Sequence, residues 1–298
     1  MSPDSATIAI TGASGLVGGA LCEALSRRGH RVRALTRRPD ARLSALPNVS
    51  RFECDLPDRI DVESLRGCDV VVHCAYVTRF RSRREAVRVN EEGTSRLLAA
   101  ARAAGVPRFV FVSTTSAHAD AASYYGQSKH RLEQLLDPAR DLVVRPGLVL
   151  SRHGGLFQRM AGGRPGTRWI VPLFDGGTQP MQTIDVNALC EGVARAVERD
   201  LRGSVVLASP ERLTMREFFE AVAEFGHRRA RFVDVPARLA LTMFRAAEAV
   251  RLPLPVSSEN LLGLLSLRYW ESTDDLRRLG LDVRPLRETL ATMAPPVA

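Results

Sequence analysis

Two side chains near the middle of the sequence, Tyr125 and Lys129, have the spacing and the chemistry of a proton-transfer pair. Residues four apart on a helix project from the same face, so the phenol and the ammonium would be neighbours. A phenol has an ordinary pKa of about 10 and is a poor base at neutral pH, but a nearby ammonium stabilises the phenolate. We therefore expect Lys129 to lower the pKa of Tyr125, so that this hydroxyl can exchange protons with a carbonyl or alcohol oxygen.

Lys129 is also the only lysine of the chain, although lysine and arginine together number 42. Arginine is a broad, planar cation, whereas lysine is a compact point charge on a flexible stem. The alternative is that an arginine-rich sequence has left one lysine at a solvated helix position. The neighbouring Tyr124 has no lysine four residues later, so it is not a candidate for the same chemistry.

Short β-branched runs alternate with longer amphipathic stretches over the first half of the chain, which is typical of parallel strands joined by helices. This pattern predicts an α/β fold built on a doubly wound parallel Rossmann sheet, whose ligands lie at the carboxyl ends of the strands. The expected strands are residues 7–11, 31–36, 49–54, 69–73, 108–113 and 142–145, and the expected helices are residues 17–28, 85–104 and 125–136.

The regular alternation of strand-like and helix-like segments ends after Pro146. This change predicts a smaller, mainly helical C-terminal substrate lobe. Residues 154–177 are rich in glycine and proline and are expected to form a loop with one short helix. A helix over 186–199, a strand over 204–208 and a capping box at Thr214-Met-Arg-Glu217 that opens another helix follow, and the mostly helical remainder is broken by Pro253 and Pro255. We predict a dinucleotide-binding domain over 1–150 and a substrate-binding lobe over 151–298, of which 186–208 return to the sheet domain.

Three glycines, Gly12, Gly15 and Gly18, separate the first expected strand from its helix. Glycine permits a tight turn and lets backbone N–H groups approach a pyrophosphate at the positive end of a helix. The strand before the glycines and the amphipathic helix after them are the context that such a motif requires. The sequence therefore predicts a dinucleotide site.

The end of the second strand indicates which dinucleotide is bound. NAD sites place an acidic residue there to hold the ribose hydroxyls. This chain has Leu35-Thr-Arg-Arg38 instead, and Arg37 and Arg38 could fork onto a 2′-phosphate. Because arginine is frequent throughout the chain, the missing carboxylate is the stronger argument. We expect NADP(H) to be favoured over NAD(H).

The glycine spacing after Thr11, G-x-x-G-x-x-G, resembles that of the short-chain dehydrogenase/reductase superfamily in its extended (atypical) form, the NAD(P)-dependent epimerase/dehydratase type. The resemblance covers residues 6–150 strongly and the chain from Asp185 onward loosely. The other matching segments are Asp55-Leu56, Val72-His-Cys-Ala75, Asn90 with Gly93-Thr94, and Arg145-Pro-Gly147.

The resemblance implies roles for individual residues. Tyr125 would be the catalytic acid or base, and Lys129 would also hold the nicotinamide ribose. A third hydroxyl would bind the substrate oxygen; Thr115 is the best match, with Ser113 or Thr114 as alternatives one or two positions earlier. The implied cofactor-binding residues are Gly12, Ser14, Gly15, Leu16, Val17, Gly18, Arg37, Arg38, Asp55, Leu56, Cys74, Ala75, Asn90, Ser113, Tyr125, Lys129, Pro146 and Gly147.

The leading hypothesis is an NADP(H)-dependent oxidoreductase that reduces a ketone or oxidises a secondary alcohol on a small, mainly apolar metabolite. A sugar-nucleotide epimerase or dehydratase with tightly bound NAD(P) is the first alternative. Nine residues separate Thr115 from Tyr125, fewer than we expect in such enzymes, and the segment from Gln179 to Asp185 lacks the arginine that often accompanies a diphosphate. The second alternative, a non-catalytic NADP-binding sensor or scaffold, would be marked by a broken Tyr/Lys pair, and here the pair is intact.

Composition limits the remaining classes. The net charge is +9 with a pI of about 10.1, but the arginines are spread along the chain. The densest group, which lacks interleaved aromatic residues, favours a solvated surface over a nucleic-acid site; it comprises Arg79, Arg81, Arg83, Arg84 and Arg88. The histidines have no ligand spacing, so we expect no metal, and His73 is expected to be a core residue.

The five cysteines are an odd number without C-x-x-C spacing, which favours reduced thiols in a cytoplasmic protein. The start of the chain lacks the pattern of a targeting segment, and no apolar stretch reaches the roughly 18 residues that span a bilayer. We expect a soluble protein with a small-molecule substrate; a homodimer is left open. The leucine-rich end of the chain is interpreted as core, or in part as an apolar pocket, and includes Leu252, Leu254, Leu261, Leu262, Leu264, Leu265 and Leu267.

Overall fold

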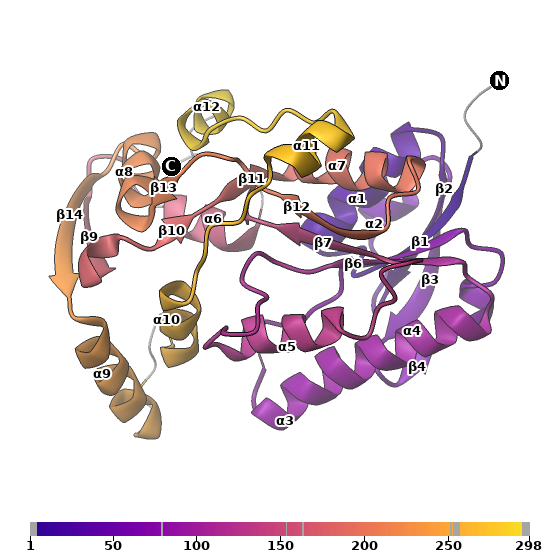
Figure 1. The fold of residues 1–298 in the computed structure, drawn as a ribbon, viewed down its shortest axis with the longest axis horizontal. Helices are drawn as coiled ribbons and strands as arrows, with labels where there is room; N and C mark the ends of the chain where they lie inside the picture. The colour runs from indigo at the N-terminus through magenta and orange to yellow at the C-terminus, as the bar shows by residue number, and fades with distance from the viewer. Residues whose placement is uncertain are drawn as a thin grey trace.

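A parallel-dominated sheet of eight strands forms the centre of the molecule (Figure 1). The computed structural model describes residues 5–78, 80–152, 154–162, 164–250, 252 and 257–293. The strand order is β12-β7-β6-β5-β1-β2-β3-β4, and only the short β4 runs antiparallel to its neighbour. The strands are β1 (Thr7–Thr11), β2 (Arg31–Thr36), β3 (Val49–Asp55), β4 (Arg59–Ile60), β5 (Val70–His73), β6 (Arg108–Val112), β7 (Leu142–Pro146) and β12 (Gly203–Leu207). The predicted doubly wound Rossmann fold is confirmed.

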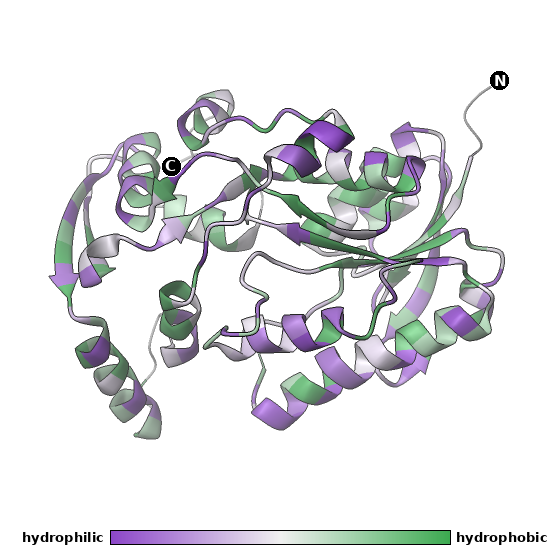
Figure 2. Ribbon diagram, viewed as in Figure 1, coloured by the Kyte–Doolittle hydropathy of each residue, from purple (hydrophilic) through white to green (hydrophobic). Residues whose placement is uncertain are grey.

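Helices cover both faces of the sheet because successive side chains of each buried strand point to opposite sides. Ile8 and Ile10 of β1 pack in one apolar cluster with α1 (Leu16–Arg27) and α7 (Val186–Glu198). Ala9 between them packs in a second cluster with residues of α4 (Gly93–Ala103) and α5 (Tyr124–Glu133). Figure 2 shows the central strands as a hydrophobic band between helices that are hydrophilic on their outer sides.

The long helix expected over residues 85–104 is interrupted. It consists of α3 (Arg83–Ala86), a π-helical segment η2 (Val87–Glu92) and α4, with Ser82 capping its start. The wider turn inserts one extra residue without breaking the helix, and π-helical insertions often lie at functional sites. Asn90, one of the residues proposed for the cofactor site, lies in this segment.

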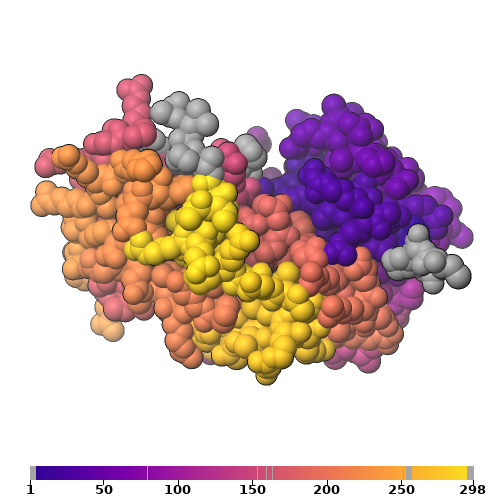
Figure 3. Space-filling model, turned by 90° about the horizontal axis from the view of Figure 1, so that it is seen from above, coloured from indigo at the N-terminus to yellow at the C-terminus, as the bar shows by residue number. Residues whose placement is uncertain are grey.

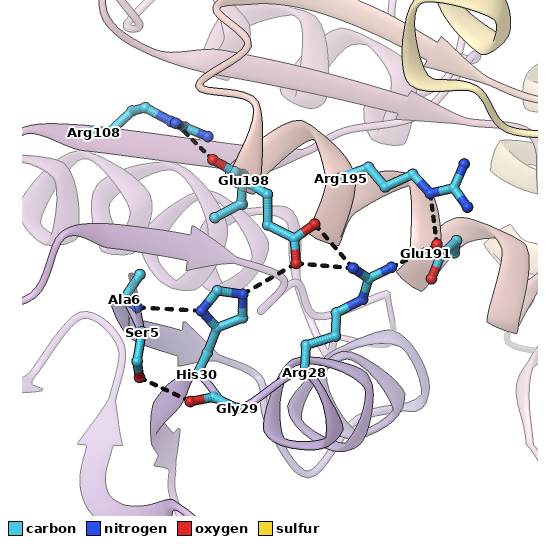
Figure 4. Close-up of polar contacts among 10 residues, drawn as sticks. Ser5, Ala6, Arg28, Gly29, His30, Arg108, Glu191, Arg195 and Glu198 are labelled. Carbon is cyan, nitrogen blue, oxygen red and sulfur yellow. Dashed lines mark hydrogen bonds and ion pairs between the residues drawn. The ribbon is translucent and has the colours of Figure 1, made fainter. Parts of the chain in front are cut away.

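An ion-pair network joins the end of α1 to α7 (Figure 4). The guanidinium of Arg28 contacts Glu198 at 2.9 Å and Glu191 at 2.5 Å. His30 accepts a hydrogen bond from the backbone N–H of Ala6 at Nδ1, at 3.3 Å, so its Nε2 is free to donate to Glu198 at 3.2 Å. The network therefore fixes the late helix α7 against the first βα unit.

The strand after α7 joins the same sheet, since β12 pairs in parallel with β7. Residues 203–207 thus lie at the edge of the central sheet. The division of the chain near residue 150 into a dinucleotide-binding domain and a substrate lobe stays a prediction.

Three small two-stranded sheets and seven further helices make up most of the remaining described chain. β8 (Leu148–Leu150) pairs with β11 (Thr183–Asp185), β10 (Pro180–Met181) with β13 (Leu213–Thr214), and β9 (Arg168–Phe174) with β14 (Arg229–Val235). The helices are α2 (Ala41–Ser44), α6 (Gly155–Ala161), α8 (Met215–Phe225), α9 (Ala237–Ala249), α10 (Ser258–Leu265), α11 (Thr273–Leu279) and α12 (Leu286–Thr292), and short 3-10 turns are η1 (Val62–Ser64) and η3 (Asp175–Gly177).

Two strands of the C-terminal half correct the sequence prediction. The stretch expected as loop with one short helix contains β9, and the stretch expected as helical contains β14. Pro172 interrupts the strand pattern in the first, and arginines occupy two of the exposed positions in the second. These features are tolerated because the two strands form only a two-stranded sheet, where proline is compatible with an edge. The Thr214 capping box that opens α8 is confirmed, whereas Pro253 and Pro255 lie outside the described residues.

The leucine-rich segment divides between core and surface. Leu261 is fully buried in a cluster with Phe174 and Ala240, as a core residue should be. Leu252 is 58% exposed, and Leu254 lies outside the described residues. The cysteines are all free thiols, buried except for the half-buried Cys74. In the described part of the chain, no helix has the length and apolar character needed to cross a membrane, and no cluster of metal-ligating side chains is present.

Candidate active site

The residues proposed for the cofactor site follow the carboxyl ends of parallel strands. Gly12 follows β1, Arg37 follows β2, Cys74 follows β5, Ser113 follows β6 and Gly147 follows β7. Because these strands run in the same direction side by side, their carboxyl ends share one edge of the sheet. That edge is where an open α/β sheet binds its ligands.

The glycine loop at this edge leaves no room for side chains. Gly12 has a φ of 66°, and a Cβ on it would lie 2.8 Å from the backbone of Ala75. A Cβ on Gly18 would lie 2.2 Å from the carbonyl oxygen of Gly12. The helix α1 then begins at Leu16 behind Gly15, and no side chain of the described residues caps its first turn. The backbone N–H groups of the first turn of α1 are thus available to an anion. Together with the glycine loop they fit the pyrophosphate of a dinucleotide.

A chain of buried hydrogen bonds supports the floor beside the glycine loop. The imidazole of His73 contacts the Thr11 hydroxyl through Nδ1 at 2.6 Å and the Thr94 hydroxyl through Nε2 at 2.8 Å. The Thr94 hydroxyl donates in turn to the backbone carbonyl of Asn90 at 2.6 Å. Burial lowers the pKa of His73 to about 3, with the Lys129 ammonium adding to the effect. His73 is therefore a neutral core residue, as its sequence context predicted.

The side chain of Asn90 holds the loop that follows β5. Its Oδ1 accepts from the backbone N–H of Val77 at 2.8 Å, and its Nδ2 donates to the carbonyl of the same residue at 2.9 Å. Both ends of the amide are thereby engaged. Any contribution of Asn90 to cofactor binding would be through the position of Cys74 and Ala75 in the loop before Val77.

Lys129 is buried beneath the end of β6. The residue is only 3% exposed, and its Nζ donates to the carbonyl oxygen of Val112 at 2.7 Å. The ammonium also lies 4.5 Å from the ring centroids of both Tyr76 and Phe111, within range of cation–π attraction. Burial lowers the pKa of Lys129 to about 7, opposed by the Cys74 thiol and the Glu133 carboxylate. The only lysine of the chain is thus a desolvated amine at the carboxyl edge of the sheet, and it loses its charge as the pH rises through about 7.

Tyr125, one helical turn earlier, is 36% exposed at the surface of the site. Although the residue as a whole is partly exposed, desolvation raises the pKa of Tyr125, and the side chain of Thr114 opposes this shift. This shift is opposite to the expected one, and Lys129 is not among the groups that cause it; the Lys129 Nζ donates to the Val112 carbonyl.

Three hydroxyl residues follow β6 beside Tyr125, and the structure places each of them differently. Ser113 donates to the buried Glu133 at 2.5 Å. Thr115 is fixed through its backbone, with its N–H donating to Pro146 at 3.0 Å. The Thr114 hydroxyl, which the sequence offered as an alternative, influences the pKa of Tyr125 and accepts from the backbone N–H of Ser116 at 3.2 Å. The choice between Thr114 and Thr115 as the third polar group therefore stays a prediction.

A glycine allows α5 to approach the end of β6 closely. A Cβ on Gly126 would lie 2.4 Å from the carbonyl oxygen of Ser116 and 2.7 Å from the side chain of Ala121. Ser123 caps the helix by accepting from the Gly126 N–H at 3.3 Å. The residue after Tyr125 therefore determines how near the phenol lies to the strand end, a role that sequence reasoning missed.

Tyr76 is a second residue that sequence reasoning missed. Its ring meets the Tyr125 ring edge-on, with centroids 5.3 Å apart and an interplanar angle of 86°. The Lys129 ammonium lies over the face of the same ring. Tyr76 thus contacts both members of the pair. Its position directly after the segment Val72-His-Cys-Ala75 was the available signal.

The C-terminal segment closes over the start of α5. The indole Nε1 of Trp270 donates to the carbonyl of Thr115 at 2.7 Å, and His118 contacts the carbonyl of Ser266 at 2.8 Å. The Glu259 carboxylate accepts from the backbone N–H of Tyr124 at 2.6 Å. Figure 1 shows α10 beside α5, and Figure 3 shows the surface notched between the N-terminal residues and the later part of the chain. Nothing local in the sequence joins residue 270 to residue 115.

Comparisons with known proteins agree on one family. A model of the NAD dependent epimerase/dehydratase family matches residues 8–146. The 4-hydroxy-2-methyl-3-oxo-4-farnesyl-3,4-dihydroquinoline-1-oxide ketoreductase of Stigmatella aurantiaca is 30% identical over 81% of this chain and 79% of its own length. The ceramide reductase of Caulobacter vibrioides is 34% identical over 52% of this chain, which spans only about half (51%) of that relative.

Solved structures repeat the fold. The structure of MoeE5 in complex with UDP-glucose and NAD superposes with a TM-score of 0.70 and covers 96% of each chain. The sequences are 22% identical, so this likeness shows the shared architecture and nothing finer.

Proposed function

Because the chain belongs to the NAD-dependent epimerase/dehydratase family of extended short-chain dehydrogenases/reductases and is an NAD(P)-dependent oxidoreductase, we propose that it interconverts a ketone and a secondary alcohol on a small, mainly apolar molecule with NADP(H). The single observation that carries this proposal is the buried Lys129 one helical turn after Tyr125, at the sheet edge that also holds the glycine loop. A substrate oxygen bound there could accept hydrogen bonds from the Tyr125 hydroxyl and from a nearby hydroxyl such as that of Thr114.

The residues of the glycine loop, with the loop after β5, would hold the dinucleotide. When bound, the nicotinamide supplies hydride transfer to or from carbon. The protein supplies the proton: the Tyr125 hydroxyl donates to the carbonyl oxygen in reduction, or its phenolate accepts the proton of the alcohol in oxidation. The Tyr125 hydroxyl is protonated at neutral pH, as the donor in reduction must be, but its raised pKa makes it a weaker acid until the bound cofactor and substrate change its surroundings. Thr114 donates a hydrogen bond to the same oxygen, and Lys129 provides positive charge beneath the pair.

The names of two relatives support an apolar substrate. One is a ketoreductase whose named substrate carries a farnesyl group, and the other is named for ceramide. The short connection between Thr115 and Tyr125 supports the same reading, because it leaves little chain to shape a sugar pocket. Residues 257–270, which close over α5, would form the wall against which an apolar substrate packs.

The activity is tested by following NADPH oxidation with a panel of apolar ketones, including steroid and long-chain ketones, beside UDP-glucose. Oxidation of NADPH with an apolar ketone and none with UDP-glucose is the expected result. Interconversion of UDP-glucose without net consumption of NADPH would assign the epimerase reaction instead. If no carbonyl oxidises NADPH while the protein still binds it, the chain is a nucleotide-binding protein without this activity.

The preference for NADP(H) is proposed to rest on Arg37 and Arg38. Both side chains are exposed just past the end of β2, and neither forms an ion pair among the described residues. Replacing both with alanine should raise the KM for NADPH by about 10- to 100-fold, since a hydrogen bond to a charged group contributes roughly 1.5–3 kcal/mol. The KM for NADH should change little. Equal effects on the KM for NADPH and the KM for NADH would show that these arginines do not bind a 2′-phosphate.

The choice between Thr114 and Thr115 is tested by paired valine variants. Thr114→Val should lower kcat by about 10- to 100-fold, because one donor to the developing oxyanion is removed while the shape is kept. Thr115→Val should leave kcat within about threefold of the wild type, since the described bonds of Thr115 are made by its backbone. Steady-state kinetics with the ketone identified by the panel measure both. A larger loss in Thr115→Val would restore the assignment that the sequence favoured.

A further inference from the structure

Helix α9 carries a stripe of apolar side chains that face solvent. Leu239, Met243 and Val250 are 54%, 59% and 69% exposed, and their spacing places them on one side of the helix and its C-terminal cap. A different side of the same helix attaches it to the protein, because Ala237 and Ala240 are buried against other residues of the lobe. The stripe is therefore not the face that anchors α9, and it is unusual to leave three such side chains so exposed together.

Unpaired arginines lie to one side of this stripe and on the neighbouring sheet. Arg238 and Arg245 project from exposed positions on the flank of α9. The sheet β9–β14 leads directly into α9, and its outward face carries three more exposed arginines, with Arg229 opposite Arg168 and Arg231 opposite Ile170. Throughout the described chain, none of these five arginines forms an ion pair, although neighbouring Arg216 pairs with Asp234.

The neighbouring sheet also exposes apolar side chains. Ile170 is 66% exposed and Val233 is 40% exposed, on the same outward face as the arginines of β9 and β14. Figure 1 shows β9, β14 and α9 together along the edge of the molecule farthest from the N-terminal strands. We call this surface the β14–α9 face; it consists of Arg168, Ile170, Arg229, Arg231, Val233, Arg238, Leu239, Met243, Arg245 and Val250.

We propose that the β14–α9 face binds the surface of an anionic phospholipid bilayer. A helix with exposed apolar residues and arginines alongside them inserts its apolar side chains at the boundary between headgroups and acyl chains, while the guanidiniums bind lipid phosphates. The lack of carboxylate partners leaves these five guanidiniums free to bind phosphate. A nucleic acid would match the arginines but not the exposed leucine, methionine and valine. The overall charge of +9 adds long-range attraction to the same surface.

This binding would bring the candidate active site to the membrane. α9 packs on α10, and α10 packs on α5, the helix that carries Tyr125 and Lys129. If the proposed function is correct, an apolar ketone dissolved in the bilayer would have a short path to the site. The membrane binding itself does not depend on that activity, and it is measured without substrate.

The test is co-sedimentation of the purified full chain with phosphatidylcholine vesicles that do or do not contain phosphatidylglycerol. Binding to the anionic vesicles, weakened by salt, and little binding to the neutral ones are expected. Arg238→Gln with Arg245→Gln should weaken binding by about 30-fold, from roughly fivefold for each arginine near an anionic surface. Leu239→Ser with Met243→Ser should weaken it at least about tenfold through lost apolar insertion.

Two matched controls remove the same groups elsewhere. Arg59→Gln with Arg66→Gln deletes two charges from arginines that are each 64% exposed and already paired, and Leu135→Ser deletes a leucine that is 47% exposed on the sheet domain. Both should bind vesicles like the wild type. The proposal is overturned if the wild type does not bind anionic vesicles, if neutral vesicles bind it equally, or if the controls lose as much binding as the α9 variants. It is also overturned if the α9 variants instead abolish self-association of the protein in solution, which would assign this face to a second copy of the chain.

Discussion

Tyr125→Phe should abolish turnover while leaving dinucleotide binding nearly unchanged. The substitution removes only the hydroxyl, which is the proposed proton donor. Loss of a general acid typically lowers the rate by about 10²- to 10⁴-fold, and loss of the hydrogen bond to the substrate oxygen adds to this. We therefore expect kcat to fall at least about a thousandfold. Single-turnover kinetics with NADPH and the ketone, beside a fluorescence titration of NADPH, measure the two properties separately.

Tyr124→Phe is the matched control, because it removes the same group from the adjacent residue. Tyr124 is 2% exposed, and the Arg83 guanidinium lies 3.7 Å from the centroid of its ring. Its kcat should stay within about threefold of the wild type. If Tyr125→Phe retained a tenth of the wild-type rate, or if Tyr124→Phe were equally inactive, Tyr125 would not be the proton donor.

Lys129→Met should inactivate the enzyme and yet make the folded protein more stable at neutral pH. A lysine in the unfolded chain has a pKa of about 10.4, whereas burial lowers the pKa of Lys129 to about 7. The folded state therefore binds this proton less well, and its stability is reduced below pH 7 and recovers as the pH rises from about 7 to about 10.4. At pH 7 the penalty is roughly 4 kcal/mol, of which about 1 is offset in the variant by the lost hydrogen bond to Val112.

The measurement is urea denaturation of wild type and Lys129→Met across that pH range. The variant should be more stable by roughly 3 kcal/mol near pH 6, and the difference should vanish near pH 10. Lys129→Arg is the control: it keeps a cation that does not deprotonate, so it should not be stabilising at any pH. A variant Lys129→Met that is less stable than the wild type at neutral pH would mean that the ammonium is better solvated or better paired than its burial indicates.

The sheet and its glycine loop were predictable from the sequence because their signals are local. A continuous apolar run such as Val70-Val-Val72 is typical of a central parallel strand that is buried on both faces. The glycines from Gly12 to Gly18 lie close together in the sequence, between one strand and the next helix. The pairing of Tyr125 with Lys129 on one helix is equally local. The family resemblance added roles to positions that were already fixed by this pattern.

What could not be predicted depends on where the chain leaves regular structure or meets distant residues. The alternation of side chains that orders a strand ends at Val112, so the sequence could not decide whether Thr114 or Thr115 turns toward Tyr125. The strands β9 and β14 are stabilised mainly by each other across a long separation in the chain. The burial that lowers the pKa of Lys129 also depends on neighbours from several elements, and the sequence suggested only its charge.

The contact of Trp270 with the carbonyl of Thr115 joins residues 155 positions apart. During synthesis, the strands and helices that hold the dinucleotide emerge from the ribosome well before the indole that completes the wall beside them. Synthesis proceeds at about 5–20 residues per second. For several seconds, the nascent chain therefore contains the glycine loop but not yet Trp270, which covers the site. During translation, the segments proposed to bind the cofactor are therefore complete before the segment that encloses the substrate has been made.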